Sequence, residues 1–311
     1  MTAVVFDTDI GTNVDDALAL ALALASQEIQ LLGVVVGNGD RGLLETRARI
    51  AARLLGLAGR ADIPVLIGHP GRLSPSDRYT NHGDEGEGLL DTPVDVADAR
   101  ILDVPGADWL IAQSRRERIH VVATGPLTTL AVAMQRDVEL AARLDHLTVM
   151  GGMAQDYNTA CDPAAALTCA ESGVDITWVT IDITLRTAMT RRALDALAAQ
   201  RTPFCDALAR LTTTWSRRHF RPREDAPPDA VAYYHDPLAM SAVFAGRWLS
   251  LRRERLRYSV DDGVFRAMPA ADSDGPAHDA LVSVEVDPNA FEDEWLARVV
   301  GSFGGSDTRK S

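Results

Sequence analysis

Four aspartates are crowded into ten residues near the start of the chain, and no other feature restricts its fold and chemistry as strongly. They lie in the stretch DTDIGTNVDDALAL, from Asp7 to Leu20, as Asp7, Asp9, Asp15 and Asp16. Residues 3–6 predict a short buried strand, and the Ala- and Leu-rich run from Ala17 predicts a buried helix. The acids therefore fall on a strand-to-helix turn, at the edge of a parallel sheet where ligands bind.

Two interpretations account for these acids. Asn13, Asp15 or Asp16 could cap the helix, because side-chain oxygens accept hydrogen bonds from its first free amides and carboxylates complement the helix dipole. Capping explains one or two acids, but not four. Like charges this close raise one another's pKa unless a metal ion or a shared proton intervenes. We therefore favour a metal site.

Strand and helix patterns alternate along the rest of the chain. Further strands are predicted at 29–36, 64–68, 119–123, 147–150 and 176–183, and helices at 42–57, 107–116 and 202–220 and from residues 127 and 163. Residues 252–286 alternate as antiparallel edge strands do, and residues 289–300 predict a closing helix. We expect an α/β fold with one domain, residues 1–303, built on a mostly parallel, doubly wound sheet flanked by helices, with a small antiparallel C-terminal addition. Residues 304–311 predict a disordered tail.

Charge and composition narrow the range of partners. The 311 residues carry a net charge of -13, which argues against a nucleic-acid partner and favours a small or neutral ligand. The only lysine is Lys310, which nearly excludes a Walker-type phosphate loop or Schiff-base chemistry. No stretch approaches the roughly 20 apolar residues of a membrane span, and the chain enters its first strand without a basic, hydrophobic leader. We expect a cytoplasmic protein that does not bind a membrane.

Polar residues follow several of the predicted strands. Asn38 and Thr124 each come after one strand, and Asp156 and Asn158 follow another. On its own, Asn38 would more commonly be a turn residue. A long loop, residues 69–90, contains the glycine-rich segment NHGDEGEG with His82. Such loops in compact domains are often functional, although a lone histidine there is more often just a surface residue.

The segment Tyr233, Tyr234, His235, Asp236 also has two interpretations. Two aromatic rings beside a histidine and an acid could form a wall for base stacking with a proton donor, or they could be ordinary packing and a helix cap. A basic run precedes the segment, with Arg217, Arg218, Arg221 and Arg223. Such runs are typical of solvated helix ends.

Six motifs together resemble the nucleoside hydrolase family, also called inosine-uridine preferring nucleoside hydrolases. In chain order they are DTDIGTNVDDALAL, GVVVGN, NHGDEGEG, TGPLTT, DYNTACDP and YHDPLA. The resemblance spans nearly the whole chain, and six motifs at fitting separations are highly specific. It implies hydrolysis of the N-glycosidic bond of ribonucleosides, a calcium ion as cofactor, and a homodimer or homotetramer.

The resemblance also implies roles for individual residues. Calcium would be held by Asp9, Asp16, the carbonyl of Thr124 and Asp236. Asp9 would also be the general base. The ribose hydroxyls would be bound by Asp15, Asn38, Asp156, Asn158 and Asp236. For the proton donated to the leaving base, His235 is the first candidate and His82 the second.

This chain departs from the usual family pattern at three places, one of which is the short loop from Gly151 to Asp156, without the upstream asparagine that many members use near the sugar. The first turn has Ile10 where DxDPGxDD has proline, and its loop is two residues longer. Asp156 and Tyr157 stand where many members have a glutamate and a phenylalanine before the second sugar-binding asparagine. The sequence does not choose between purine and pyrimidine bases.

Two other functions stay open from the sequence. In a haloacid dehalogenase-type phosphatase, Asp7 and Asp9 would form the DxD motif, but such enzymes need a positioned basic residue and Lys310 is unsuitable. A non-catalytic, metal-dependent nucleoside or ribose sensor would keep the same pocket without turnover. Release of free ribose distinguishes the hydrolase from both.

Overall fold

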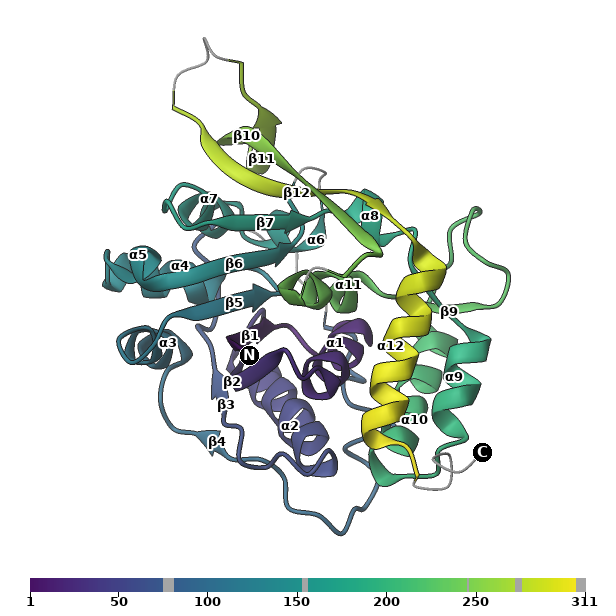
Figure 1. Ribbon diagram of the computed structural model, residues 1–311. Coiled ribbons are helices and arrows are strands. Elements are labelled where there is room, and N and C mark those ends of the chain that lie inside the picture. Colours follow the sequence, from purple (N-terminus) through teal and green to yellow (C-terminus); the bar gives the residue numbers. More distant parts are fainter. Residues whose placement is uncertain (75–80, 153–155, 245, 272–275, 306–311) are drawn as a thin grey trace.

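The fold was obtained as a computed structural model, which describes residues 1–74, 81–152, 156–244, 246–271 and 276–305. A ten-stranded sheet runs through the molecule in the order β11-β10-β12-β7-β6-β5-β1-β2-β3-β4 (Figure 1). Every neighbouring pair from β12 to β4 is parallel, whereas β10 pairs antiparallel with both β11 and β12. This confirms the predicted α/β class and the antiparallel C-terminal addition.

The strands of the large sheet are β1 (Thr2–Thr8), β2 (Ile29–Val36), β3 (Val65–Ile67), β4 (Ile101–Leu102), β5 (Ile119–Ala123), β6 (Leu144–Met150), β7 (Ile176–Val179), β10 (Leu249–Asp261), β11 (Val264–Pro269) and β12 (His278–Val286). A separate two-stranded antiparallel sheet joins β8 (Ala188–Thr190) and β9 (Ala230–Tyr233).

The helices are α1 (Asp15–Ala25), α2 (Arg41–Leu57), α3 (Gly106–Ser114), α4 (Thr128–Arg136), α5 (Leu140–Arg143), α6 (Tyr157–Cys161), α7 (Pro163–Ala170), α8 (Ile181–Thr184), α9 (Arg191–Ala198), α10 (Pro203–His219), α11 (His235–Ser241) and α12 (Pro288–Phe303). A short 3-10 helix, Ala242–Phe244, follows α11. No helix among the described residues is both long and apolar enough to cross a membrane.

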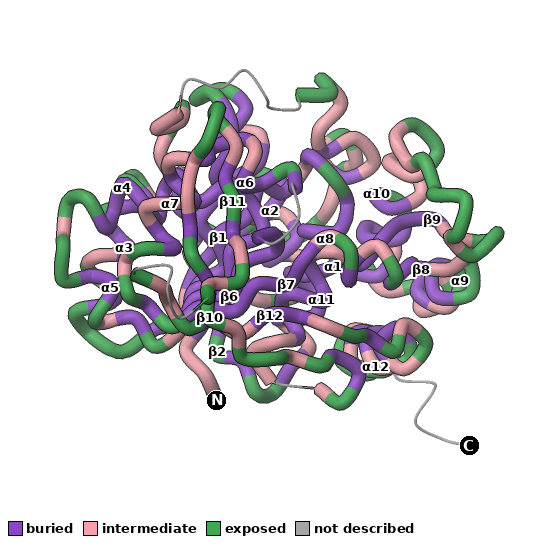
Figure 2. Tube along the Cα trace, turned by 90° about the horizontal axis from the view of Figure 1, so that it is seen from above, coloured by how far each residue is buried: buried purple, intermediate pink, exposed green. Residues whose placement is uncertain are grey.

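Two apolar cores lie on the two faces of the sheet, because side chains alternate along each strand. On β1, Val4 and Phe6 belong to the core under α1, α2 and α9 to α12. Val5 points the other way, into the core under α3, α4, α5 and α7. Buried residues fill the centre of the molecule, and exposed residues gather on the outer loops and helices (Figure 2).

Three predicted boundaries are corrected. The first strand continues to Thr8, and α1 begins at Asp15 instead of Ala17. The strand predicted at 176–183 ends at Val179, because Thr184 N donates to Thr180 O and the chain turns into α8. The β-branched run ITWVTIDI favoured a strand throughout, and this turn overrides that preference. Of the predicted tail, residues 306–311 lie outside the described residues.

The parallel register brings the predicted polar residues to one edge of the sheet. Asp7 pairs with Ala123 on β5, and Ala123 pairs with Val149 on β6, so β1, β5 and β6 end level with one another. The turn after β5 also passes very close to the turn after β1. A Cβ atom on Gly125 would stand 2.9 Å from the backbone nitrogen of Asp9, which only a glycine avoids.

Candidate active site

A pocket of about 100 Å³ lies where these strands end. It is lined by Asp9, Thr12, Asn13, Asp15, Asp16, Thr124, Met150, Tyr157, Asn158, Ile181, His235 and Asp236. Seven of the predicted site residues are among them, and they come from segments more than 200 residues apart in the sequence. The packing of α1 against α11 brings the first motif, DTDIGTNVDDALAL, next to the last one, YHDPLA.

Three buried carboxylates in this pocket form a group that could hold a metal ion. Asp15 and Asp16 open α1 and Asp236 lies in the first turn of α11, with one oxygen of each within 4.8 Å of the others. Burial is the main cause that raises their pKa values: that of Asp15 rises to about 7, and those of Asp16 and Asp236 rise well above the usual range. Mutual repulsion and the charge of Asp9 add to the effect. A divalent cation would replace the protons that this arrangement otherwise requires.

The carboxylates of this group differ in one member from the predicted carboxylate ligands. Asp16 and Asp236 were predicted as ligands and belong to it, whereas Asp15, predicted for the ribose, is its third carboxylate. Asp9 lines the same pocket and does not belong to the group. Asp7 lies apart from these carboxylates, because it points to the opposite face of β1 with Val5 and is fully buried. Burial, and then the charge of Asp9, raises the pKa of Asp7 to about 8.

Threonine hydroxyls orient Asp16. The Thr124 hydroxyl donates to Asp16 Oδ1 at 3.0 Å, and the Thr8 hydroxyl donates to the same oxygen. The carbonyl of Thr124, predicted as a metal ligand, accepts a hydrogen bond from Asn158 Nδ2 at 2.8 Å. Asn158 also donates to the Met150 carbonyl at 3.1 Å, so this asparagine fixes the ends of both β5 and β6.

Asp9 is held by two side chains that both contact the same oxygen. Asn38 Nδ2 donates to Asp9 Oδ2 at 2.7 Å, and the Thr12 hydroxyl donates to it at 3.3 Å. Asn38 adopts a left-handed backbone conformation, with φ of 62°, and its Oδ1 accepts from Arg72 at 3.3 Å. The predicted sugar contact is thus also the residue that orients Asp9.

His235 lines the pocket next to Asp236. Its Nδ1 lies 2.7 Å from the Thr184 hydroxyl on α8. Burial lowers the pKa of the imidazole to about 4, so the ring is neutral at pH 7 and carries one N–H.

The lengthened first loop is anchored by Arg47, which sequence reasoning missed. This residue of α2 is fully buried, and its guanidinium donates to the carbonyls of Asp9 and Ile10 and, at 2.7 Å, to the Thr12 hydroxyl. The Trp215 indole N–H also donates to the Thr12 carbonyl at 3.3 Å. A signal existed in the sequence, because helical spacing places Arg47 on the apolar face of residues 42–57, four residues after Leu43.

Replacing Arg47 should therefore loosen the loop that carries Asp9. We expect Arg47→Met to lower the free energy of unfolding by about 3 kcal/mol, because buried carbonyl and hydroxyl groups lose a charged partner. Urea unfolding measures this loss. Arg49→Met is the matched control, since Arg49 is exposed on the same helix. Similar losses of unfolding free energy in both variants would show that the buried hydrogen bonds of Arg47 do not stabilise the protein.

Asp156 does not take its predicted place at the ribose. Its carboxylate caps α6, accepting from Thr159 N at 2.9 Å and from the Thr159 hydroxyl at 2.8 Å, and it also accepts from Gly152 N at 3.0 Å. It does not line the pocket. An aspartate is one methylene shorter than the glutamate of the family pattern. At this length its carboxylate accepts hydrogen bonds from the backbone amides of the surrounding turn and does not reach the pocket.

Four other predicted residues also lie outside the pocket lining: Asn38, which reaches it through Asp9, and Tyr233, Tyr234 and His82. Tyr234 is fully buried in the core, with its ring 5.3 Å from that of Trp295, so its prediction as a stacking wall is wrong. Tyr233 packs against His235 at 5.2 Å between ring centroids, and its hydroxyl accepts from Arg223 N. His82 is exposed and stacks on His219 at 4.1 Å. These positions leave His235 as the histidine that lines the pocket.

Comparisons with known proteins agree with this geometry. A family model described as inosine-uridine preferring nucleoside hydrolase matches residues 4–293. The probable uridine nucleosidase 2 of Arabidopsis thaliana is 32% identical over 257 residues, covering 78% of this chain and 77% of that protein. The pyrimidine-specific ribonucleoside hydrolase RihA of Photobacterium profundum is 30% identical over 259 residues, covering 77% of this chain and 82% of that protein. A solved plant nucleoside hydrolase, PpNRh1, superposes with a TM-score of 0.81 at 27% identity, covering 96% of this chain and 98% of that one.

Proposed function

Because the chain belongs to the family of inosine-uridine preferring nucleoside hydrolases, it is an N-glycosyl hydrolase that acts on ribonucleosides, and we propose that it does so with a calcium ion held by Asp15, Asp16 and Asp236. The observation that supports the calcium proposal is the buried carboxylate group itself. Hard oxygen ligands suit calcium, and three carboxylates leave further coordination positions open. When bound, the ion would offset the negative charge of the pocket and supply open positions for oxygen atoms of the substrate. The Thr124 carbonyl is a fourth candidate ligand.

Asp9 is proposed as the general base. Within the described part of the chain, both hydrogen bonds to its carboxylate fall on Oδ2, so Oδ1 is available to a water molecule in the pocket. Oδ1 takes one proton from this water as its oxygen attacks the anomeric carbon and the N-glycosidic bond breaks. Asn38 and Thr12 hold the carboxylate in place for this step.

His235 is proposed as the proton donor to the leaving base. With Nδ1 next to the Thr184 hydroxyl, its ring presents its other nitrogen, Nε2, to the pocket. The ring donates from its protonated imidazolium form and returns to the neutral form that burial favours. A base that accepts a proton departs as a neutral molecule instead of an anion, so it is a better leaving group and the bond breaks more easily. Asp15, Asn158 and Asp236 line the part of the pocket where ribose hydroxyls would bind.

The effect of removing this donor depends on the leaving group. We expect His235→Ala to slow the cleavage of uridine by ~100-fold or more, and to affect p-nitrophenyl riboside little, because that leaving group needs no proton. Steady-state kinetics on the two substrates measure the difference. His82→Ala is the comparison variant and should change neither rate by much. Equal losses on both substrates for His235→Ala would assign this residue to positioning instead.

Pyrimidine ribonucleosides such as uridine are the proposed substrates. The two relatives described above, at 32% and 30% identity, are named for uridine and pyrimidine ribonucleosides. The pocket is strongly acidic, and interactions in a partly desolvated site are weakly screened, so a phosphate group would be repelled. We expect free ribose from uridine, at a higher kcat/KM than from inosine, and little from uridine 5'-monophosphate. Comparable rates on the monophosphate would contradict this substrate class.

A cytoplasmic location and a homodimer or homotetramer also belong to the proposal. The family resemblance supports the assembly. Light scattering coupled to size-exclusion chromatography measures the assembly directly, and a monomer at micromolar concentration would contradict it.

A further inference from the structure

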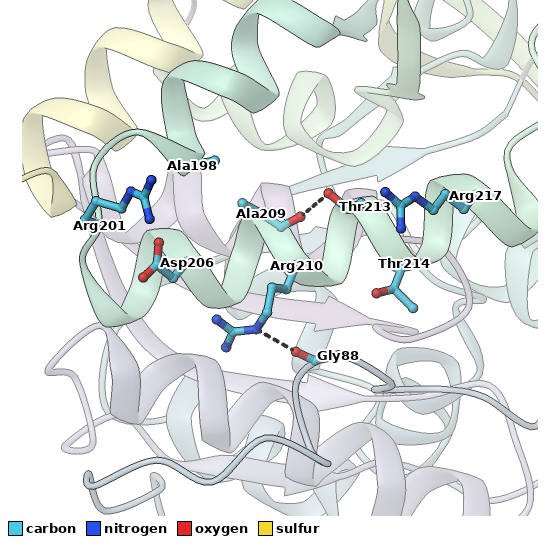
Figure 3. A pocket seen from close by; sticks show the side chains of 9 residues that line it. All are labelled: Gly88, Ala198, Arg201, Asp206, Ala209, Arg210, Thr213, Thr214 and Arg217. Atoms are coloured by element: carbon cyan, nitrogen blue, oxygen red, sulfur yellow. Dashed lines mark hydrogen bonds between the residues drawn. The ribbon is translucent and has the colours of Figure 1, made fainter.

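A second and larger cavity, of about 570 Å³, lies along α10 (Figure 3). It is lined by Gly88, Ala198, Arg201, Asp206, Ala209, Arg210, Thr213, Thr214 and Arg217. None of these residues lines the carboxylate pocket. The cavity is therefore separate from the active site, and its volume falls in the range of small-molecule sites, roughly 300–1,000 Å³.

Three arginines and a single carboxylate give this cavity a positive charge. Arg210 Nε donates to the Gly88 carbonyl at 3.4 Å, and within the described ranges Arg201 and Arg217 have neither a hydrogen-bond partner nor an ion-pair partner. The neighbouring Arg218 is different, because it pairs with Asp84 and Glu87. Asp206 is the single acidic residue in the lining, so the cavity keeps an excess of positive charge in a chain whose acidic residues outnumber basic ones by 44 to 31.

The backbone at Arg201 determines how this side chain reaches the cavity. This residue lies in the turn between α9 and α10 with φ of 55°, a left-handed conformation in which glycine is more favourable than any residue with a Cβ atom. This conformation ends α9 and carries the Arg201 side chain to the cavity.

Helical spacing spreads the other cationic groups along the cavity. Arg210 and Arg217 are seven residues apart on α10, so both lie on the same face of the helix. Figure 3 shows Arg201 and Arg217 toward opposite ends of the cavity, with Arg210 between them along the helix. Cationic groups separated in this way suit a ligand with more than one anionic group.

We propose that this cavity binds a phosphate-bearing small molecule of the size of a nucleoside diphosphate, through Arg201, Arg210 and Arg217. The planar guanidinium group donates two parallel hydrogen bonds to a phosphate, which makes arginine the preferred residue for this recognition. The acidic pocket that holds Asp9 cannot serve the same ligand, because its charge has the opposite sign. This inference does not depend on the proposed catalytic function.

Calorimetric titration of the metal-loaded, desalted protein with adenosine diphosphate tests the proposal, with inorganic phosphate as a second ligand to separate a nucleotide site from a free-phosphate site. We expect saturable binding at one site per chain. Arg217→Gln and Arg201→Gly should each weaken it by at least about tenfold. Glycine suits the backbone at position 201, so that variant should fold at least as well as the parent. Binding should be unchanged in Asp9→Asn.

The matched control is Arg257→Gln, which removes an exposed arginine of β10 that has no ion-pair partner in the described part of the chain. If binding weakens equally in this variant, the arginines act only through the overall charge of the protein and not through a specific site, which would overturn the proposal. Absence of saturable binding at millimolar ligand would also overturn it. So would dissociation of an oligomer by Arg217→Gln, because the arginines would then pair with a second copy of the chain.

Discussion

Asp9→Asn is expected to lower the turnover of uridine by ~10²- to 10⁴-fold, the range typical of a lost general base. The amide keeps the size of the side chain and an oxygen that can accept from Asn38, but it cannot take a proton from water. The change should therefore act on kcat far more than on KM, as steady-state kinetics will show.

Asp156→Asn provides the matched control for this experiment. Asp156 belongs to one of the six motifs, but its carboxylate caps α6 outside the pocket lining, and asparagine can keep the capping bond from Thr159 N while it gives up the bond from Gly152 N. Its turnover should stay close to that of the parent protein. Near-normal turnover in Asp9→Asn, with metal still bound, would show that another group is the base.

Removing the metal ion should make the stability of the protein strongly dependent on pH. The pKa of Asp15 is raised to about 7 in the folded state, so the folded protein retains a proton that the unfolded chain loses near pH 4. Stability of the metal-free protein should therefore fall as the pH rises from about 4 to 7, by about 1.4 kcal/mol per pH unit for each such proton. Asp16 and Asp236 act in the same direction.

Thermal unfolding of metal-free and calcium-loaded protein at pH 5 and pH 7.5 measures this effect. The metal-free protein should melt at a lower temperature at pH 7.5 than at pH 5, and calcium should remove most of the difference because it takes the place of the protons. Asp15→Asn should reduce the pH dependence of the metal-free protein. A metal-free protein that is equally stable or more stable at pH 7.5 would contradict the assignment of the carboxylate group.

The order of elements and the location of the site follow from patterns that are local in the sequence. Alternating strand and helix signals predicted the parallel sheet, and parallel strands bring their carboxyl ends to one edge. Asp16, Thr124 and Asp236 could therefore be expected together although they are far apart in the chain. The motif resemblance identified the family before any coordinates.

The predictions failed where a side chain has a partner that local sequence does not reveal. Tyr234 follows directly after Tyr233 at the end of β9, and nothing in the local sequence indicates that its ring points into the core against Trp295. Asp156 looked like a ligand residue, but the backbone amides around it use both of its oxygens. Helical spacing places Arg47 on the apolar face of α2, but only the packing of α2 under the first loop shows what its guanidinium contacts.

The most direct test of the catalytic account is to follow the release of free ribose from uridine while calcium is titrated into metal-free protein. The account predicts no activity without metal, and activity that rises with calcium and levels off near one equivalent per chain, as expected for a single site. Full ribose release by the metal-free protein, or none after calcium is restored to folded protein, would contradict it.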